Sequence, residues 1–158
     1  MKGHPYGIID PSKIPEVADK ILDEFFQITE QLKIKACLAL GLCLGFVRDG
    51  KYIKGDNDLD VVAVCDKEDR NKLVSFLEQS KFNQGRTFRH KGYDNIHFYK
   101  NKILVDIHFR EPEGNYSNFE SVRYKKKTYP VPCPVEKYLS LCYSNWKVKE
   151  DQTSTYYG

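Results

Sequence analysis

The sequence lacks any run of about eighteen apolar residues, which is the length that a membrane-spanning helix requires. Residues 1–16 contain no long apolar stretch either, so we expect neither secretion nor a membrane span. The chain also lacks an excess of one charge, because 25 Lys and Arg residues oppose 22 Asp and Glu residues. The formal net charge of +3 gives no electrostatic reason to expect nucleic acid as a partner.

Cysteines are few, and their spacing gives no metal or redox motif. The five cysteines are an odd number, include no C-x-x-C pair, and mostly lie in apolar segments, where a thiol packs as a small hydrophobic group. We therefore expect free thiols and a cytoplasmic location. With 158 residues, the chain is expected to form a single compact domain over 1–158, with a flexible tail at 147–158.

Apolar spacing predicts helices and strands that alternate along the chain. Residues 15–32 and 67–79 carry apolar side chains at three- and four-residue spacings, which is the pattern of an amphipathic helix. Residues 93–99 and 103–109 predict two strands joined by a short turn, which is a β-hairpin. The other expected elements are buried strands at 35–40 and 58–64, a tight turn and short helix over 41–48, a small strand pair within 124–131 and a last helix from Pro134. This alternation is typical of the α/β (α+β) class and predicts a mixed β-sheet flanked by helices.

The most informative segment is residues 41–60, in which a glycine-containing turn and a basic loop lead into a strand that begins with acids. Asp58 and Asp60 are two residues apart, so both side chains project from the same face of the strand. Two carboxylates this close repel one another unless a cation lies between them. Oxygen ligands suit Mg²⁺ or Mn²⁺ better than Zn²⁺, which favours His and Cys spacings that this segment lacks. Two solvated acids in a turn before a strand are the alternative interpretation.

A third acid lies in a second apolar run. Asp106 is the only carboxylate between Ile103 and Phe109. An unpaired charge inside a buried strand is costly, so we expect a neighbouring strand to bring Asp58 and Asp60 beside Asp106, around one or two cations. Without a cation the acids would repel one another, so replacing Asp60 or Asp106 by Asn is expected to stabilise the metal-free protein slightly.

These residues together resemble the LicD and fukutin-related family of the nucleotidyltransferase (polymerase beta-like) fold superfamily. In that family, a glycine turn and a G-x-x-R helix precede a strand with several acids, and an isolated Asp lies in a later apolar strand. The matching residues here are Gly41, Gly45, Arg48, Asp56, Asp58, Asp60 and Asp106. A further similarity to the family's last helix is carried by Val131-Pro132-Cys133-Pro134, Tyr138, Tyr143 and Trp146.

The chain departs from the family pattern at two positions. Leu42 follows Gly41 where the superfamily has a small hydroxyl residue or a second glycine, so a hydroxyl contact to a nucleotide phosphate is missing. Asn57 stands where the family usually has another Asp. The chain is also shorter than typical members, so the part that binds the acceptor is expected to be reduced.

The resemblance implies a metal-dependent transfer of a phospho-alcohol, such as phosphocholine or ribitol phosphate, from a nucleotide-linked donor. The donor would be a CDP-alcohol and the acceptor a hydroxyl group such as that of a glycan. Asp58, Asp60 and Asp106 would be the catalytic residues and the ligands of Mg²⁺ or Mn²⁺. The implied nucleotide-binding residues are Gly41, Gly45 and Arg48.

Three further residues are candidates for substrate contacts. Lys51 and Lys54 either screen a diphosphate or are solvated hairpin lysines. His108 shares a strand face with Asp106 and is either a base or metal-site partner, or a hydrogen-bonded sheet histidine. Two other functions stay open: a nucleotidyltransferase that attaches a nucleoside monophosphate from an NTP to a small hydroxylated molecule, and a non-catalytic nucleotide- or metal-binding module.

Overall fold

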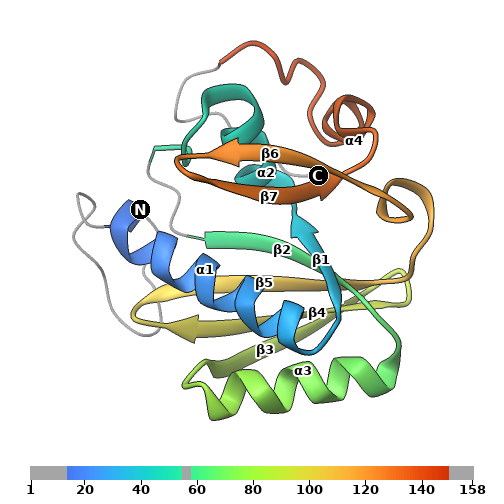
Figure 1. Ribbon diagram of the computed structural model, residues 1–158. Coiled ribbons are helices and arrows are strands. Elements are labelled where there is room, and N and C mark those ends of the chain that lie inside the picture. Colours follow the sequence, from blue (N-terminus) through green and yellow to red (C-terminus); the bar gives the residue numbers. More distant parts are fainter. Residues whose placement is uncertain (1–13, 55–57, 150–158) are drawn as a thin grey trace.

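A computed structural model describes residues 14–54 and 58–149 (Figure 1). The helical elements are α1 (Ile14–Gln31), α2 (Leu40–Leu44), the π-helical turn η2 (Gly45–Asp49), α3 (Lys67–Gln79), the 3-10 turn η3 (Gly114–Tyr116) and α4 (Val135–Cys142). The strands are β1 (Lys35–Leu38), β2 (Asp58–Val64), β3 (Asn83–His90), β4 (Tyr93–Lys100), β5 (Ile103–Arg110), β6 (Phe119–Tyr124) and β7 (Lys127–Pro132). Asp56, Asn57 and residues 150–158 of the predicted flexible tail lie outside the described residues.

The main sheet has five strands in the order β1-β2-β5-β4-β3. β2 and β5 are parallel, and the other neighbouring strands are antiparallel. β6 and β7 form a separate antiparallel pair. The predicted mixed β-sheet with flanking helices is therefore confirmed.

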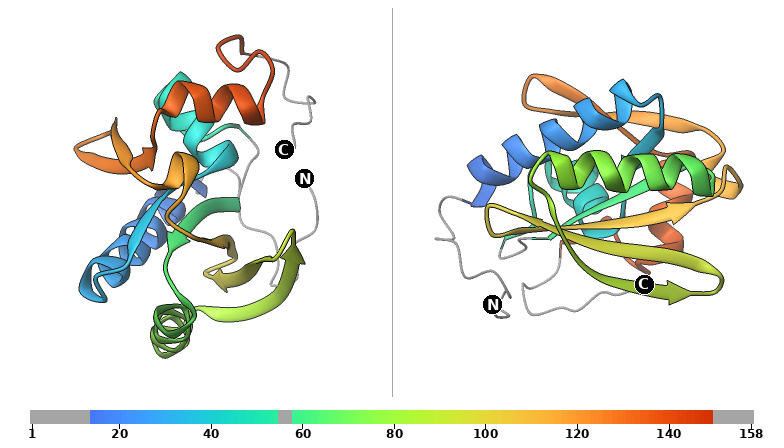
Figure 2. Two further views of the ribbon diagram at one scale, coloured as in Figure 1. Left: turned by 90° about the vertical axis from the view of Figure 1, so that its right-hand side faces the viewer. Right: turned by 90° about the horizontal axis from the view of Figure 1, so that it is seen from below.

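The helices α1 and α3 cover one face of the main sheet (Figure 2). The apolar stripe of α1 is buried, and Ile21, Leu22 and Phe25 belong to the core of the protein. Leu73 and Leu77 of α3 pack into the same core. Burial of these stripes removes apolar surface from water, and the two helices shield this face of the sheet from solvent.

The acids of β2 project from the other face of the main sheet. Leu59 and Val61 are buried in the core that α1 and α3 share with the sheet. Because side chains alternate along a strand, Asp58 and Asp60 point away from this core. β5 follows the same rule, since its buried Val105 and Ile107 flank Asp106 in sequence. The sheet therefore separates the hydrophobic core from the candidate site residues.

The chain after β1 turns earlier than the sequence predicts. The strand expected over 35–40 ends at Leu38, and Leu40 already begins α2 with a φ of 42°. The Leu40 amide donates a hydrogen bond to the Tyr138 hydroxyl at 3.0 Å, which gives the backbone of this turn a partner. Gly41 consequently lies within a helix, where it is buried, and not in the predicted tight turn.

The turn predicted at Asp49-Gly50 is present, because Gly50 ends η2 with a left-handed φ of 71°. The segment after it does not form a strand in the structure. Lys51 and Lys54 are exposed, as expected for solvated lysines, but they lie in a loop and not in a hairpin. The loop passes close to η2, and this packing holds it without a strand partner.

β3 is an element that the sequence analysis does not predict. Its sequence, NQGRTFRH, has few apolar residues and no clear alternation. It is an edge strand whose neighbour in the sheet is β4. Backbone hydrogen bonds to β4, and not a pattern of apolar side chains, hold it in the sheet. The predicted hairpin of β4 and β5 is confirmed, with Asn101 and Lys102 in its turn at φ values of 50° and 68°.

A carboxylate of α1 links this helix to the β6–β7 hairpin and to the loop after η2. Asp19 accepts hydrogen bonds from the hydroxyl of Tyr52 at 2.7 Å and from the hydroxyl of Tyr124 at 2.8 Å. It also pairs with Lys125 Nζ at 2.6 Å. The Tyr124 ring stacks on Phe46, with 4.1 Å between the ring centroids. Asp19 thus joins α1, the loop after η2 and the small sheet.

All five cysteines are free thiols, as predicted. Burial raises the pKa of Cys43 to about 12 and the pKa of Cys65 to about 11, so both stay protonated at neutral pH and are weak nucleophiles. Within residues 14–54 and 58–149, no helix combines the length and the apolar character needed to cross a membrane.

Candidate metal centre

Asp60 and Asp106 lie side by side on neighbouring strands. β2 and β5 run parallel, and their register places Asp60 directly opposite Asp106. The two side chains are only 18% and 20% exposed, so neither acid is simply solvated. The sheet therefore brings together two of the three acids that the sequence analysis singles out.

Two histidines adjoin this pair of acids. His108 follows Asp106 on the same face of β5, and its Nε2 is 3.5 Å from Asp60 Oδ1 and 3.5 Å from Asp106 Oδ2. His97 is the partner of Asp106 on β4, and its Nε2 is 3.6 Å from Asp106 Oδ1. One potential ligand atom from each of Asp60, Asp106 and His108 lies within 4.8 Å of the other two.

The donor set fits a divalent cation. Among the described residues, the buried atoms Asp106 Oδ1 and His108 Nε2 have no hydrogen-bond partner. The contacts of 3.5 and 3.6 Å within the group are longer than ordinary hydrogen bonds of about 2.7–3.2 Å. Ligand atoms held about 2.1 Å from a cation would be roughly 3.0–3.4 Å apart, which is closer to the observed spacing. A cation would also satisfy buried polar atoms that are otherwise costly.

The electrostatic surroundings of the two acids differ. Burial raises the pKa of Asp60, and the nearby His108 imidazole only partly offsets this. Burial also raises the pKa of Asp106, but His108 and His97 outweigh it and hold the pKa of this carboxyl well below its usual range. Burial lowers the pKa of the His108 imidazole, but Asp106 and Asp60 outweigh it and raise this pKa to about 9. Asp106 is therefore the more strongly anionic of the two acids.

Asp58 occupies the first position of β2, where its register partner is Leu104 and not Asp106. It lies on the same strand face as Asp60, two residues away. The compact group of ligand atoms, however, contains His108 and not Asp58. The role of Asp58 as a metal ligand stays a prediction.

Gly45 is required by the packing of the chain against itself. A Cβ atom at this position would lie 2.6 Å from the Lys51 carbonyl oxygen and 3.2 Å from the Ile53 amide nitrogen. Any larger residue would therefore push the loop after η2 away from the helix. The predicted contacts of Gly41 and Gly45 with a nucleotide remain predictions.

Arg48 is engaged by the neighbouring acid. Its Nε is 2.9 Å and its Nη2 is 3.0 Å from the two carboxylate oxygens of Asp49. Its Nη1 donates to the Trp146 carbonyl at 3.4 Å. Because the forked face of the guanidinium already meets a carboxylate, binding of a phosphate by Arg48 would require this pair to open. Lys51 and Lys54 are exposed, and their predicted contacts with a diphosphate remain predictions.

Comparisons with known proteins give distant structural likenesses alone. No protein-family model matches the chain, and no curated protein matches it in sequence. Among solved structures, a cytoplasmic RNA terminal U-transferase is similar to it, with 14% sequence identity and a TM-score of 0.47. The match covers 64% of this chain and 30% of that chain, so this chain spans less than a third of that protein. At this similarity the likeness decides nothing about activity, and the resemblance to the LicD and fukutin-related family rests on the motif residues alone.

His97 is the residue of the site that the sequence analysis misses. A signal for it is nevertheless present in the predicted hairpin. The turn at Asn101 and Lys102 pairs Lys100 with Ile103, and antiparallel pairing counted outward from there sets His97 opposite Asp106. Counting the register from the turn would therefore have placed His97 beside the acid.

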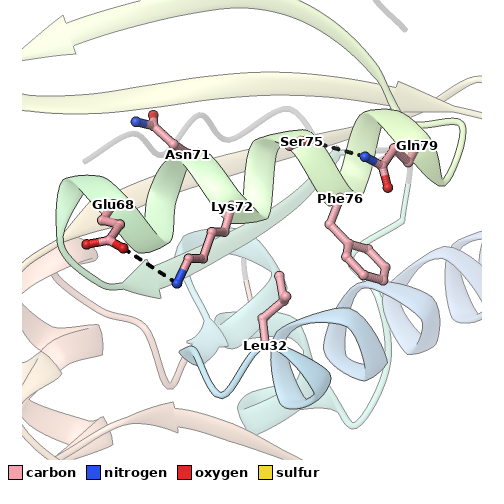
Figure 3. A pocket seen from close by; sticks show the side chains of 7 residues that line it. All are labelled: Leu32, Glu68, Asn71, Lys72, Ser75, Phe76 and Gln79. Atoms are coloured by element: carbon pink, nitrogen blue, oxygen red, sulfur yellow. Dashed lines mark hydrogen bonds and ion pairs between the residues drawn. The ribbon is translucent and has the colours of Figure 1, made fainter.

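A separate groove lies between α1 and α3 (Figure 3). Leu32 and Phe76 point into the space between these helices, and the Glu68–Lys72 ion pair of 3.7 Å also lines it. Its volume is about 490 Å³. The residues that line the groove come from α3 and from the end of α1, whereas Asp60 and Asp106 point away from the core that these helices cover, so the groove is not part of the metal centre.

Proposed function

We propose that this protein is a metal-dependent transferase that moves a phosphorylated group from a nucleotide-linked donor to a hydroxyl acceptor. The observation that carries the proposal is the position of Asp60 directly opposite Asp106 on parallel strands. Asp106 Oδ1 and the neighbouring His108 Nε2 are buried and have no hydrogen-bond partner among the described residues. The likeness of the surrounding sequence to the LicD and fukutin-related pattern supports it.

The residues of this group suit phosphoryl-type transfer, in which positioning and charge neutralisation matter more than covalent help from the protein. Asp60 and Asp106 would hold a divalent cation, Mg²⁺ or Mn²⁺, and Asp58 would add a further carboxylate from the same strand face. When bound, such a cation supplies positive charge to the phosphate oxygens and lowers the pKa of a hydroxyl group near it. Two neighbouring strands of one sheet fix the positions of both acids.

The donor that we propose is a nucleoside-diphosphate-linked alcohol such as CDP-choline or CDP-ribitol, and the acceptor is a hydroxyl group such as that of a glycan. A P–O bond within the diphosphate breaks, and a new P–O bond forms to the acceptor oxygen, which loses its proton. A nucleoside monophosphate leaves. The alternative donor is a nucleoside triphosphate, which would place a nucleoside monophosphate on a small hydroxylated acceptor and release pyrophosphate.

Donor screening tests this proposal. Wild-type protein would be incubated with CDP-alcohols or nucleoside triphosphates and Mg²⁺ or Mn²⁺, with mixed hydroxyl acceptors, and the phosphorus products followed by NMR. Release of CMP from a CDP-alcohol, lost in Asp60→Asn and Asp106→Asn, is the expected result. Glu68→Gln is the matched control, because it removes an exposed carboxylate on α3. Pyrophosphate release would favour the alternative donor, and the absence of both turnover and nucleotide binding would favour a non-catalytic module.

A further inference from the structure

A second pocket lies beside the metal centre, where the end of β5 meets α4. Asp106, His108 and Arg110 alternate along β5, so all three side chains project from the same face of the sheet. Nη2 of Arg110 lies 3.5 Å from Nδ1 of His108, and Arg110 also lines this pocket, which has a volume of about 360 Å³. Arg110 follows Asp106 by four residues, which is about 13 Å along an extended strand. A ligand that fills the pocket can therefore extend along β5 to the metal centre.

The lining of this pocket is largely aromatic and aliphatic. Tyr93, Tyr116 and Tyr138 contribute their side chains, and Leu141 of α4, which is 72% exposed, also lines it. The rings of Tyr116 and Tyr138 meet edge to face, with 6.1 Å between their centroids. Small-molecule sites of this size combine apolar and aromatic walls with a few polar groups that fix the orientation of the ligand. The lining suits a small planar ring.

The Arg110 side chain gives the pocket a rigid flat surface. Its guanidinium carbon lies over the Tyr93 ring, 5.0 Å from the ring centroid. Nη1 of Arg110 donates to Asn95 Oδ1 at 3.0 Å and to the Phe109 carbonyl at 2.9 Å, so the guanidinium plane is fixed before any ligand arrives. Nucleobases stack on guanidinium planes as they do on aromatic rings.

The polar groups that this pocket offers to a ligand are mainly acceptors. The Tyr93 hydroxyl donates to Oε1 of Glu113, which orients this carboxylate. The amide nitrogen of Asn115 donates to the carbonyl oxygens of Cys133 and Pro134 at 3.3 and 3.4 Å, so Oδ1 is the side-chain atom of Asn115 that can meet a ligand. A ligand edge that enters here has to donate hydrogen bonds, as the exocyclic amino group of cytosine or adenine does.

We propose that this pocket binds the base of the nucleotide donor, stacked on Arg110, and that Glu113 selects a base with an exocyclic amino group. This inference rests on the proposed function, since the phosphates of the donor would then lie toward Asp60 and Asp106. The charges of the lining agree with this orientation. Glu111 and Glu113 oppose a single arginine there, so a phosphate inside the pocket would be repelled.

Nucleosides, which carry no phosphate, test the pocket separately from the cation site. Binding of cytidine, uridine, adenosine and inosine to the full chain in EDTA would be followed by NMR chemical-shift changes. Cytidine should bind more tightly than uridine, and adenosine more tightly than inosine, by at least about fivefold. Leu141→Arg should weaken cytidine binding at least about tenfold, because the new side chain occupies the pocket and pairs with its carboxylates. Val148→Arg is the matched control, because Val148 is 62% exposed and lies outside the lining.

Glu113→Gln tests the selectivity itself. The glutamine oxygen can still accept from Tyr93, and its amide group then presents a donor to the ligand. The preference should therefore reverse from cytidine to uridine, which has a carbonyl oxygen in place of the amino group. A merely structural role of Glu113 would weaken both nucleosides equally and would overturn the assignment of Glu113.

Three other outcomes would overturn the inference. Equal affinities for cytidine and uridine in wild type would exclude selection of an amino group, and unchanged cytidine binding in Leu141→Arg would exclude this pocket. If Leu141→Arg does not fold, the absence of nuclear Overhauser contacts between cytidine and the Leu141 methyl groups of wild type would exclude it equally. Absence of nucleoside binding, with CMP release from a CDP-alcohol still observed, would overturn the inference and leave the proposed function standing. Nucleoside binding with the expected preferences, but without any binding of Mn²⁺ or Mg²⁺, would support the pocket and overturn the proposed function.

Discussion

At the residue scale, the chemistry of the site depends on two acids that are close together but unequally stabilised. Burial raises the pKa of Asp60, whereas the two neighbouring histidines overcome burial and lower the pKa of Asp106. Simple repulsion between the acids predicts that loss of either charge stabilises the metal-free protein. The histidines, which that argument omits, change the expectation for Asp106.

We therefore expect opposite effects from the two Asn substitutions in EDTA. A raised pKa means that the ionised form is disfavoured by folding, so Asp60→Asn should raise the melting temperature at pH 7. A lowered pKa means that Asp106 contributes stability above its unfolded pKa of about 3.9, and that this contribution is lost as the pH falls through the folded value. Asp106→Asn should lower the melting temperature at pH 7, and the loss should shrink in acid.

Melting curves between pH 3 and pH 8 measure both effects, with Glu68→Gln as the control for removal of an exposed carboxylate. The control should follow wild type throughout. Stabilisation by both Asn substitutions would mean that repulsion between the acids dominates and that the histidines do not stabilise Asp106.

At the element scale, the site depends on the registers of three neighbouring strands. The sequence predicts β2, β4 and β5, because each is an apolar run with turn signals beside it. It also predicts that Asp58 and Asp60 share a face. It does not predict which residue of β2 lies opposite Asp106, since β2 and β5 are far apart in sequence and their parallel pairing depends on packing of the whole sheet.

The turn between β4 and β5 is a place where the native sequence is strained. Lys102 has a φ of 68°, which costs a residue with a Cβ roughly 1–2 kcal/mol. Lys102→Gly should therefore raise the free energy of unfolding, by about 1 kcal/mol after the entropy that glycine loses on folding. Urea denaturation measures the change. Lys126→Gly is the matched control, because Lys126 lies in the β6–β7 turn without a left-handed φ, and it should not stabilise.

A lower unfolding free energy for Lys102→Gly than for wild type would contradict this account of the turn. It would mean that the lysine side chain contributes more than its backbone strain costs. The register that sets His97 opposite Asp106 would then depend on that side chain as well as on the turn.

At the scale of the whole molecule, the two sheets and α1 are joined by polar contacts that sequence patterns do not reveal. Asp19 of α1 accepts from Tyr52 and Tyr124 and pairs with Lys125, although these partners are far from it in sequence. The periodicity of α1 marks its apolar stripe only, so a polar residue on another face gives no signal. Long-range contacts of this kind depend on the whole fold and leave no pattern in the local sequence. The same is true of the edge strand β3.

Replacing Asp19 should therefore cost more stability than replacing a neighbouring acid whose partners are exposed. Asp19→Ala leaves two tyrosine hydroxyls without their acceptor and should lower the free energy of unfolding by about 1–3 kcal/mol. Asp23→Ala is the control, because Asp23 pairs with the exposed Lys127 and accepts a hydrogen bond from the exposed Gln27, and its loss should cost less than about 1 kcal/mol. Equal losses in the two variants, measured by urea denaturation, would show that Asp19 is not a structural junction.

The most direct test of the central claim, that Asp60 and Asp106 form one cation site, is calorimetric titration of Mn²⁺ into metal-free protein. Wild type and Glu68→Gln should bind with equal affinity, and both Asp60→Asn and Asp106→Asn should lose at least about tenfold in affinity while remaining folded. Equal Mn²⁺ affinity in all four proteins would contradict the claim and show that the two acids are not the ligands.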